Sequence, residues 1–330
     1  MAAKTVSVIN LKGGVGKSTI TMMLSEYLVF DHHMRVLLLD LDSQANLTYA
    51  MVSNTGIQTQ QRNHRTMYDL FKSVVQGALP NVLDFIAQPP LTVSNISRYT
   101  INDTNARLHM VVSMPAMAQL DDDLVAALLD SRDITRADHI RTSLRQMLDK
   151  VKKEYDYVLI DCPPGLSIFS SAALIASDYF VSPIIPEPLS LQGIDLVRTR
   201  ITNLRDKFPT PKFAGTIMNI VKLYRKTHKT IASQLYSSQE RKYNPFNFWL
   251  PDSELLRKLG EFEAELIPQD RWGGGAESKF GSLALKYSIS WSLANPPEPI
   301  FPTTNLEGPT YKLYNRIESL NNEFIERTSS

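Results

Sequence analysis

The sequence predicts an α/β fold in which a doubly wound, mostly parallel sheet carries helices on both faces. Short, continuously apolar runs alternate with segments of helical periodicity, which is typical of parallel strands that are buried on both faces. A glycine-rich turn joins the first apolar run directly to the first helical segment. The predicted strands cover residues 5–10, 36–39, 108–112, 157–160, 179–185 and 213–220.

Helical spacing of apolar residues predicts the elements between and after these strands. The first helix follows the glycine-rich turn, another precedes the fourth predicted strand, and a shorter one covers residues 66–75. Residues 311–327 predict a final amphipathic helix whose polar face mixes both charges. We therefore expect one domain over residues 1–330, with polar or Pro/Gly-rich excursions at about 53–106 and 268–310.

The glycine-rich turn has the composition of a phosphate-binding loop. Its glycines allow backbone conformations that are closed to other residues, so successive N–H groups converge on phosphate oxygens. Lys17 supplies a positive charge for the β- and γ-phosphates, and the Ser18 hydroxyl is a ligand suited to Mg²⁺. Leu11 stands where the usual loop pattern begins with glycine. The candidate nucleotide-binding residues of the loop are Lys12, Gly13, Gly14, Val15, Gly16, Lys17, Ser18 and Thr19.

Two carboxylates, Asp40 and Asp42, follow the second predicted strand. Ligands of open α/β sheets lie beyond the carboxyl ends of the strands, and a spacing of two residues puts both acids on the same side. Beside a phosphate loop, they suit a magnesium shell and a water molecule that has to be oriented. The alternative is that they only cap the helix that follows.

A third acid, Asp161, ends the apolar strand at residues 157–160. A carboxylate in this position holds Mg²⁺ in nucleotide hydrolases, often through water. The run Pro163-Pro164-Gly165 then turns the chain sharply. We interpret Cys162, between the acid and the turn, as a small buried residue rather than a nucleophile.

Three segments together resemble the ParA/MinD family of ATPases. They are the loop K-G-G-V-G-K-S with its additional first lysine, D-L-D-S-Q-A-N at residues 40–46, and Y-D-Y-V-L-I-D-C-P-P-G at residues 155–165. Ser43 departs from the family, which usually has proline there. The resemblance covers about residues 4–267 and implies a Mg²⁺-dependent ATPase that forms a homodimer around ATP.

The resemblance also implies roles for single residues. Lys12 reaches the phosphates of a partner subunit, Lys17 binds phosphates, and Asp42 positions the attacking water, which makes these three the catalytic candidates. The residues expected at the metal are Ser18, Asp40 and Asp161. Asn219, at the end of the strand 213–220, is similar to the asparagine with which the family recognises adenine. A strand-ending turn asparagine is the alternative interpretation.

Composition narrows the function classes and the compartments that are possible for this protein. A net charge of +1 gives no global cationic field, so any nucleic-acid surface has to be a local patch. The single cysteine excludes a disulfide framework and a cysteine-built metal site, and it favours a reducing compartment. Because the sequence starts at its first strand, we expect neither a signal peptide nor an N-terminal helix-turn-helix domain. The last helix lacks the cationic face of membrane-targeting relatives, so we expect a cytoplasmic protein with no membrane partner.

Basic residues gather at 198–207 and again at 222–229. Each could neutralise one DNA phosphate, although solvated helix faces are the alternative. The resemblance implies non-specific DNA binding through the later half of the chain, and the favoured residues are Lys222, Arg225, Lys226 and Lys229. The expected function is partition or positioning of a plasmid, chromosome or other cargo on the nucleoid, with a ParB-like or other cargo-bound activator.

Two other functions are compatible with the same motifs. One is a nucleotide-gated scaffold that positions a protein complex without binding DNA. The other is a metabolic enzyme such as a ligase, for which only residues 53–106 and 268–310 offer material for a substrate pocket.

Overall fold

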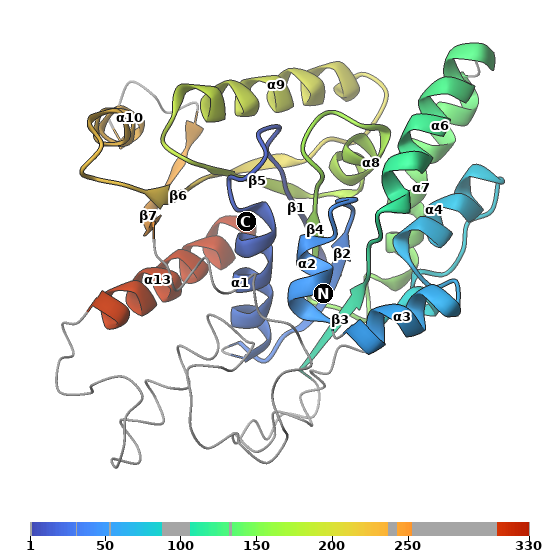
Figure 1. Cartoon of the computed structure of the whole chain (residues 1–330), viewed down its shortest axis with the longest axis horizontal. Helices are drawn as coiled ribbons and strands as arrows, with labels where there is room; N and C mark the ends of the chain where they lie inside the picture. The colour runs from blue at the N-terminus through green and yellow to red at the C-terminus, as the bar shows by residue number, and fades with distance from the viewer. Residues whose placement is uncertain are drawn as a thin grey trace.

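The computed structural model describes residues 2–30, 32–52, 54–87, 106–131, 134–236, 243–252 and 309–329. Within them, seven strands form one sheet in the order β3-β2-β4-β1-β5-β6-β7, and all neighbouring strands are parallel (Figure 1). The strands are β1 Lys4–Val8, β2 Arg35–Asp40, β3 Arg107–Val111, β4 Tyr157–Asp161, β5 Tyr179–Ile184, β6 Lys212–Val221 and β7 Pro245–Pro251. The predicted α/β fold is confirmed.

Helices flank the sheet on both faces (Figure 1). They are α1 Lys17–Phe30, α2 Asn46–Met51, α3 Asn54–Arg62, α4 Met67–Val75, η1 Val82–Phe85, α6 Ala116–Ser131, α7 Ile134–Val151, α8 Ile168–Ala176, α9 Pro188–Arg205, α10 Lys226–Tyr236 and α13 Pro309–Ser329. Alternate residues of a strand serve opposite faces. In β2, Val36 and Leu38 pack in the core with α1 and α13, whereas Leu37 and Leu39 pack in the core with α4, α7 and α8.

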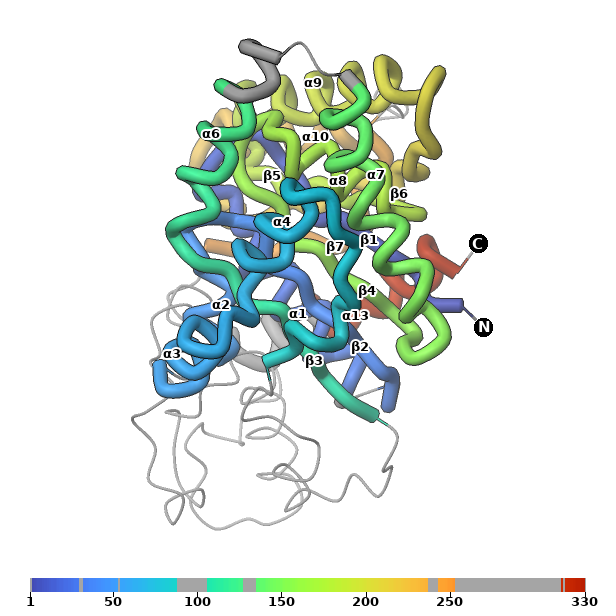
Figure 2. The backbone as a smooth tube through the Cα atoms, turned by 90° about the vertical axis from the view of Figure 1, so that its right-hand side faces the viewer, coloured from blue at the N-terminus to red at the C-terminus, as the bar shows by residue number. Residues whose placement is uncertain are grey.

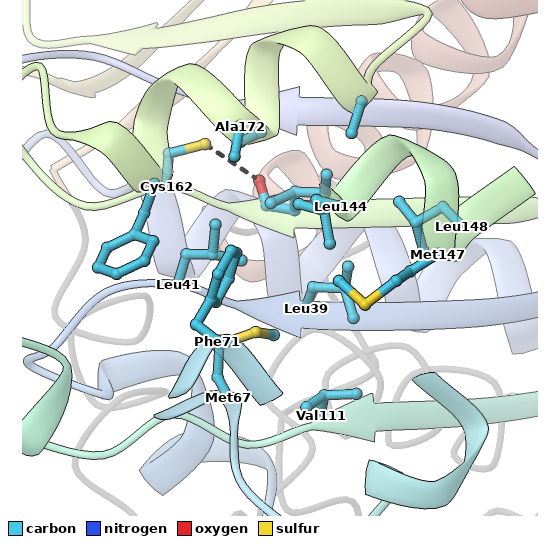
Figure 3. Packing of buried hydrophobic residues seen from close by; sticks show 14 of the residues in the cluster. Leu39, Leu41, Met67, Phe71, Val111, Leu144, Met147, Leu148, Cys162 and Ala172 are labelled. Atoms are coloured by element: carbon cyan, nitrogen blue, oxygen red, sulfur yellow. Dashed lines mark hydrogen bonds between the residues drawn. The ribbon is translucent and has the colours of Figure 1, made fainter. Parts of the chain in front are cut away.

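Aromatic and aliphatic side chains pack together in the second of these cores (Figure 3). Phe71 of α4 lies against Phe169 of α8, with ring centroids 4.6 Å apart. Cys162 is fully buried beside them and donates a weak hydrogen bond to the Ile160 carbonyl. Burial raises the pKa of the Cys162 thiol. The cysteine therefore packs as a small apolar residue, as its sequence context predicts.

The predicted helix at residues 66–75 corresponds to α4, and Thr66 is its N-cap. The Thr66 side chain accepts from the Asp69 backbone while the Asp69 carboxylate accepts from the Thr66 backbone, which forms a capping box. The final helix extends beyond the predicted 311–327 by two residues at each end. Most of the excursion at 268–310, together with residue 53 and residues 88–105 of the excursion at 53–106, lies outside the described residues.

The edge strand β7 is absent from the sequence prediction. Prolines stand at both of its ends, and Asn247 interrupts its apolar pattern. Such a segment does not resemble a buried parallel strand, but an edge strand tolerates both features because one side of it is unpaired. In the structure, β7 gains a partner on its open side from the last helix, α13.

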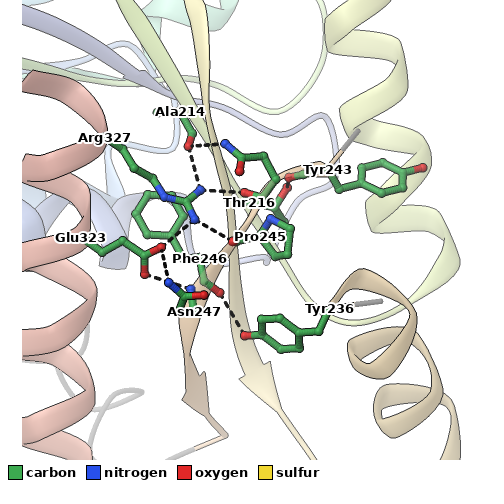
Figure 4. Close-up of polar contacts among 10 residues, drawn as sticks. Ala214, Thr216, Tyr236, Tyr243, Pro245, Phe246, Asn247, Glu323 and Arg327 are labelled. Atoms are coloured by element: carbon green, nitrogen blue, oxygen red, sulfur yellow. Dashed lines mark hydrogen bonds and ion pairs between the residues drawn. The ribbon is translucent and has the colours of Figure 1, made fainter. Parts of the chain in front are cut away.

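Arg327 fastens α13 to the edge of the sheet (Figure 4). Its guanidinium donates to the carbonyls of Ala214, Asn244 and Pro245 at 2.8–3.0 Å and pairs with Glu323 at 2.6 Å. The same group lies over the Phe246 ring, 4.2 Å from its centroid. The planar fork of five donors matches this set of acceptors in a way that a lysine would not.

The last helix also reaches the start of the chain. The Tyr157 hydroxyl lies 2.8 Å from the Thr328 hydroxyl, and Tyr157 pairs with Lys4 in the sheet. Figure 2 shows the two chain ends on the same side of the molecule. None of the helices in the described ranges combines the length and apolar character needed to cross a bilayer.

We predict that Arg327→Met lowers the free energy of unfolding by about 2–3 kcal/mol, because three carbonyls and Glu323 lose a charged donor. Arg205→Met, at the exposed end of α9, is the matched control and should change stability by less than about 0.5 kcal/mol. Denaturant titration measures both, and equal losses in the two variants would contradict the role of Arg327.

Candidate functional site

The phosphate loop, defined here as residues 12–18, leaves the carboxyl end of β1 at the centre of the sheet. Gly14 and Gly16 have φ of 71° and 89°, values that glycine adopts without strain. The first turn of α1 follows immediately, and the Ile20 N–H donates to the Gly16 carbonyl at 2.9 Å. The free N–H groups of this first turn and the loop together favour an anion.

Asn219, at the end of β6, braces the loop from the far side of β5. Its Nδ2 donates to the Val15 carbonyl at 3.1 Å. A Cβ at Gly16 would lie 2.1 Å from the same nitrogen, so only glycine leaves room for this contact. Asn219 also lines the cleft beside the loop. The structure therefore places Asn219 at the site and gives it a supporting contact, while adenine recognition stays a prediction.

A cleft of about 370 Å³ opens beside the loop, within the size range of ligand sites. Its walls come from the loop, α1, the β2–α2 connection and the ends of β6 and β7. The lining residues are Gly13, Gly14, Gly16, Lys17, Ser18, Thr19, Met22, Asp42, Gln44, Asn46, Ala50, Pro164, Asn219, Ile220, Pro251 and Asp252. Two predicted binding residues of the loop, Lys12 and Val15, are not part of this lining.

Asp40 and Asp161 lie side by side at the carboxyl ends of β2 and β4, and both are fully buried. Asp40 accepts from the Thr48 N–H and hydroxyl at 2.9 and 2.7 Å, and from the Asp42 N–H at 3.0 Å. Burial raises the pKa of Asp40 to about 7, although these donors oppose the shift. Asp40 thus holds the segment that carries Asp42.

Asp161 has no comparable set of donors. Within the described ranges, neither of its carboxylate oxygens has a hydrogen-bond partner of good geometry. Burial, and then the charge of Asp40, raise the pKa of Asp161 well above its usual range, while Ser18 and Lys17 nearby lower it. A buried carboxylate without donors is costly unless a cation compensates it.

The donor set around Asp161 fits magnesium. In the part of the chain that the structure describes, no group of three or more His, Cys, Asp or Glu side chains forms a metal cage. Mg²⁺ is usually held by only one or two carboxylates together with phosphate oxygens and water. Asp161 and the Ser18 hydroxyl, next to a phosphate loop, have the chemistry that such a shell needs, and their role at the metal stays a prediction.

Asp42 is 5% exposed and faces the cleft from the β2–α2 connection. Its Oδ1 accepts from the Gln44 N–H at 3.0 Å, and its own N–H is held by Asp40. Both backbone contacts fix the position of the carboxylate at the cleft wall. The structure therefore places Asp42 at the cleft, while its role in orienting a water molecule stays a prediction.

The two loop lysines point to different places. Lys17 is buried and lines the cleft, with Nζ 3.4 Å from the Lys12 carbonyl. Lys12 lies outside the cleft lining and pairs with Glu187 at 2.5 Å. The structure therefore places Lys17 at the cleft and Lys12 against Glu187, while the reach of Lys12 to the phosphates of a partner subunit stays a prediction.

Sequence reasoning missed Asn10, which fixes the start of the loop. Its Nδ2 donates to the Pro183 carbonyl at 2.9 Å and its Oδ1 accepts from the Lys12 N–H at 3.0 Å. A Cβ at Gly193 would lie 2.3 Å from Asn10 Oδ1, which explains the glycine in α9. The polar Asn10 at the end of a buried strand was the available signal.

The structure separates the basic residues of the two segments into those with partners in the fold and those that are exposed. In the first, Arg198 lies over the Phe213 ring and Arg200 donates to the Ser171 hydroxyl, so these two have structural partners. In the second, Lys222 pairs with Asp252 at 2.9 Å. The exposed members of the second segment are Arg225, Lys226 and Lys229.

The parallel sheet, the glycine loop at the end of its central strand and the buried acids define a P-loop nucleotide-binding protein. Residues 3–213 match the family model described as an AAA domain. A ParA family protein of Chlamydia pneumoniae is 32% identical over 206 residues, which are 62% of this chain and 68% of that protein. Sporulation initiation inhibitor protein Soj of Bacillus subtilis is 31% identical over 191 residues, 58% of this chain and 62% of Soj. The chain belongs to the ParA/MinD family of P-loop ATPases.

The matched segments span about two thirds of the length of these two relatives. Among solved structures, apo McdA of Cyanothece has a TM-score of 0.60 at 18% identity and covers 86% of this chain and 98% of its own. A plasmid partition protein of Borrelia burgdorferi has a TM-score of 0.56 at 22% identity, covering 78% and 94%. Cobyrinic acid a,c-diamide synthase of Mycobacterium smegmatis, with ATP analog and magnesium bound, has 0.51 at 19% identity, covering 71% and 81%. At these identities the likeness concerns the fold.

We predict that Gly16→Ala destabilises the nucleotide-free protein by about 2–3 kcal/mol, because the methyl group meets Asn219 at a positive φ. Gly13→Ala is the matched control in the same loop, since among the described residues no atom beyond its chain neighbours lies within 4 Å of a Cβ there. Thermal unfolding without nucleotide compares the two. A Gly16→Ala protein as stable as Gly13→Ala would contradict the bracing of the loop by Asn219.

Proposed function

We propose that this chain is a ParA-type ATPase that binds ATP and Mg²⁺ in the cleft, dimerises around the nucleotide and positions cargo on nucleoid DNA. Partner-stimulated hydrolysis then releases it from the DNA. The observation that carries the proposal is the buried Asp161 beside the phosphate loop, whose carboxylate has no hydrogen-bond partner of good geometry among the described residues. Relatives named as ParA family proteins and as Soj support the class. A neighbouring fold solved with ATP analog and magnesium supports the ligands.

Four residues at or beside the cleft, Lys17, Ser18, Asp42 and Asp161, have separate tasks in this function. The loop N–H groups and Lys17 bind phosphate oxygens and neutralise their charge. Ser18 and Asp161 hold the metal, which supplies charge stabilisation at the transferred phosphate when bound. Asp42 accepts a hydrogen bond from the attacking water and so orients it. Catalysis by positioning and charge alone is slow until a partner completes the site, which suits a switch.

Dimerisation is supported by the position of Lys12 and by two exposed leucines that are close in sequence to residues of the site. Lys12 is outside its own cleft, and its pair with Glu187 is partly solvent-exposed. Leu166, after the Pro-Pro-Gly turn, and Leu189, in the first turn of α9, are 44% and 64% exposed. Leu166 follows Pro164 of the cleft lining by two residues, and Leu189 follows Glu187, the partner of Lys12, by two residues, so both are candidates for a surface that a second copy covers.

We predict that Asp42→Asn lowers ATP turnover about 100-fold while ATP affinity changes less than about threefold, because the variant loses the water acceptor and keeps its backbone contacts. Lys17→Ala should instead lose ATP affinity. Asp149→Asn on α7, with a side chain 52% exposed, is the matched control. Turnover and nucleotide binding are measured on the same preparations, and unchanged turnover in Asp42→Asn would contradict the proposed mechanism.

DNA binding is proposed for the exposed cations Arg225, Lys226 and Lys229 at the start of α10. We predict that reversing all three to Glu weakens ATP-dependent binding to random-sequence duplex by at least about tenfold. It should also reduce the slope of log affinity against log salt by about 3, one for each lost phosphate contact.

The matched control reverses three other exposed cations, Lys150, Lys153 and Arg205, and should keep the wild-type slope. Equal slopes in both triple variants would contradict the location of the DNA surface. A wild-type protein that binds ATP but no DNA at any salt concentration would favour a scaffold that acts through protein contacts.

A further inference from the structure

The Glu187 side chain forms its contacts with distant segments of the chain rather than with its own helix. It is the N-cap residue of α9, but its carboxylate makes no capping hydrogen bond. One oxygen, Oε2, pairs instead with Lys12 of the phosphate loop at 2.5 Å. This contact lowers the pKa of Glu187, so the carboxylate is charged at neutral pH.

The other oxygen of Glu187 faces a buried histidine. His228 of α10 is 2% exposed, and its Nε2 lies 3.6 Å from Glu187 Oε1. His228 Nδ1 accepts a hydrogen bond from the Lys222 N–H at 3.1 Å. Because a backbone N–H can only donate, the ring proton is on Nε2 and points toward Glu187. In the described ranges this Nε2 has no hydrogen-bond partner.

His228 is connected both to the nucleotide cleft and to the exposed cations of α10. Lys222, whose N–H it accepts, also pairs with Asp252 at 2.9 Å, and Asp252 lines the cleft. The chain then continues into the start of α10, where the exposed cations follow. Glu187 therefore lies between Lys12 of the loop and the segment 222–229. Its Oε2 contacts Lys12, and its Oε1 faces His228.

We propose that Glu187 is a positioning residue that exchanges Lys12 for His228 when a second copy of the chain draws Lys12 to its triphosphate, and so transmits the nucleotide state to segment 222–229. The inference rests on the proposed function, because it requires an ATP-bound dimer. Once Lys12 has left, the charged Glu187 carboxylate lacks its donor. The nearest donor is then the Nε2–H of His228, which has no other hydrogen-bond partner among the described residues.

A small movement completes the exchange. The gap of 3.6 Å has to shorten by less than about 1 Å to reach hydrogen-bond distance. A hydrogen bond between a charged carboxylate and a buried N–H is among the stronger ones in proteins. It fixes the first turn of α10 through His228 and, through Nδ1, the backbone at Lys222. The cations of α10 are then presented in one arrangement in the ATP state.

The test measures affinity for random-sequence duplex with ATP and with ADP at one salt concentration. In His228→Asn, the amide oxygen can still accept from the Lys222 N–H, but the shorter side chain does not extend a donor to the position of Nε2 beside Glu187. The ratio of ATP-state to ADP-state affinity should fall about tenfold, within the usual range of coupling between sites. ATP affinity and ATP-dependent dimerisation should equal those of the wild type.

Two further variants keep the test specific. His228→Gln extends an amide donor toward Glu187 and should restore part of the ratio. His33→Asn is the matched control, because His33 is exposed and has a φ of 53° that asparagine tolerates. A His228→Asn protein with the wild-type ratio would overturn the exchange.

A readout without DNA separates this inference from the proposed function. Backbone amides of residues 226–236 should exchange hydrogen more slowly with ATP than with ADP in the wild type, and equally fast with both in His228→Asn. Wild-type protein that dimerises with ATP without this slowing overturns the inference alone. Glu187→Gln should dimerise at about fivefold lower concentration, because Lys12 is no longer held by a charge; an unchanged or higher dimerisation concentration would equally overturn it.

Discussion

Two carboxylates buried side by side at the ends of β2 and β4 are the constraint around which this site is built. Removing a carboxylate from water costs several kcal/mol unless donors or a cation replace the lost hydration. Asp40 has its donors, whereas Asp161 has none of good geometry in the described chain. A cation at Asp161 would remove this cost, so ligand binding and stability of the folded chain are linked.

The contacts of Asp40 explain how the cleft wall is held in position. Thr48 donates to Asp40 with both its N–H and its hydroxyl, and the same hydroxyl accepts from the Ser113 N–H at 2.9 Å. This network joins the ends of β2 and β3 to α2. Asp42 is part of this network, because its backbone N–H donates to Asp40 and so holds the residue in position. A metal role for Asp40 stays a prediction, while its contacts give it a positioning role.

The sequence predicted the elements whose information is local. The glycine loop, the acids at strand ends and the N-cap of α4 each depend on residues within a few positions of one another. The contacts that hold the loop in place were not predictable, because they join residues far apart in the sequence. Lys12 and Glu187 are separated by 175 positions, and Val15 and Asn219 are separated by 204. Nothing in a local pattern shows that Glu187 faces the loop instead of capping α9.

The different surroundings of the two loop lysines suit different tasks. Lys17 is 6% exposed, so moving its ammonium away from the cleft would cost buried contacts. Lys12 and Glu187 have side chains 26% and 33% exposed, and ion pairs in such surroundings contribute only about 0–1 kcal/mol. A triphosphate carries several negative charges and competes readily with one half-solvated carboxylate. A lysine held this weakly, and outside its own cleft, is compatible with the proposed contact to a phosphate that a second subunit binds.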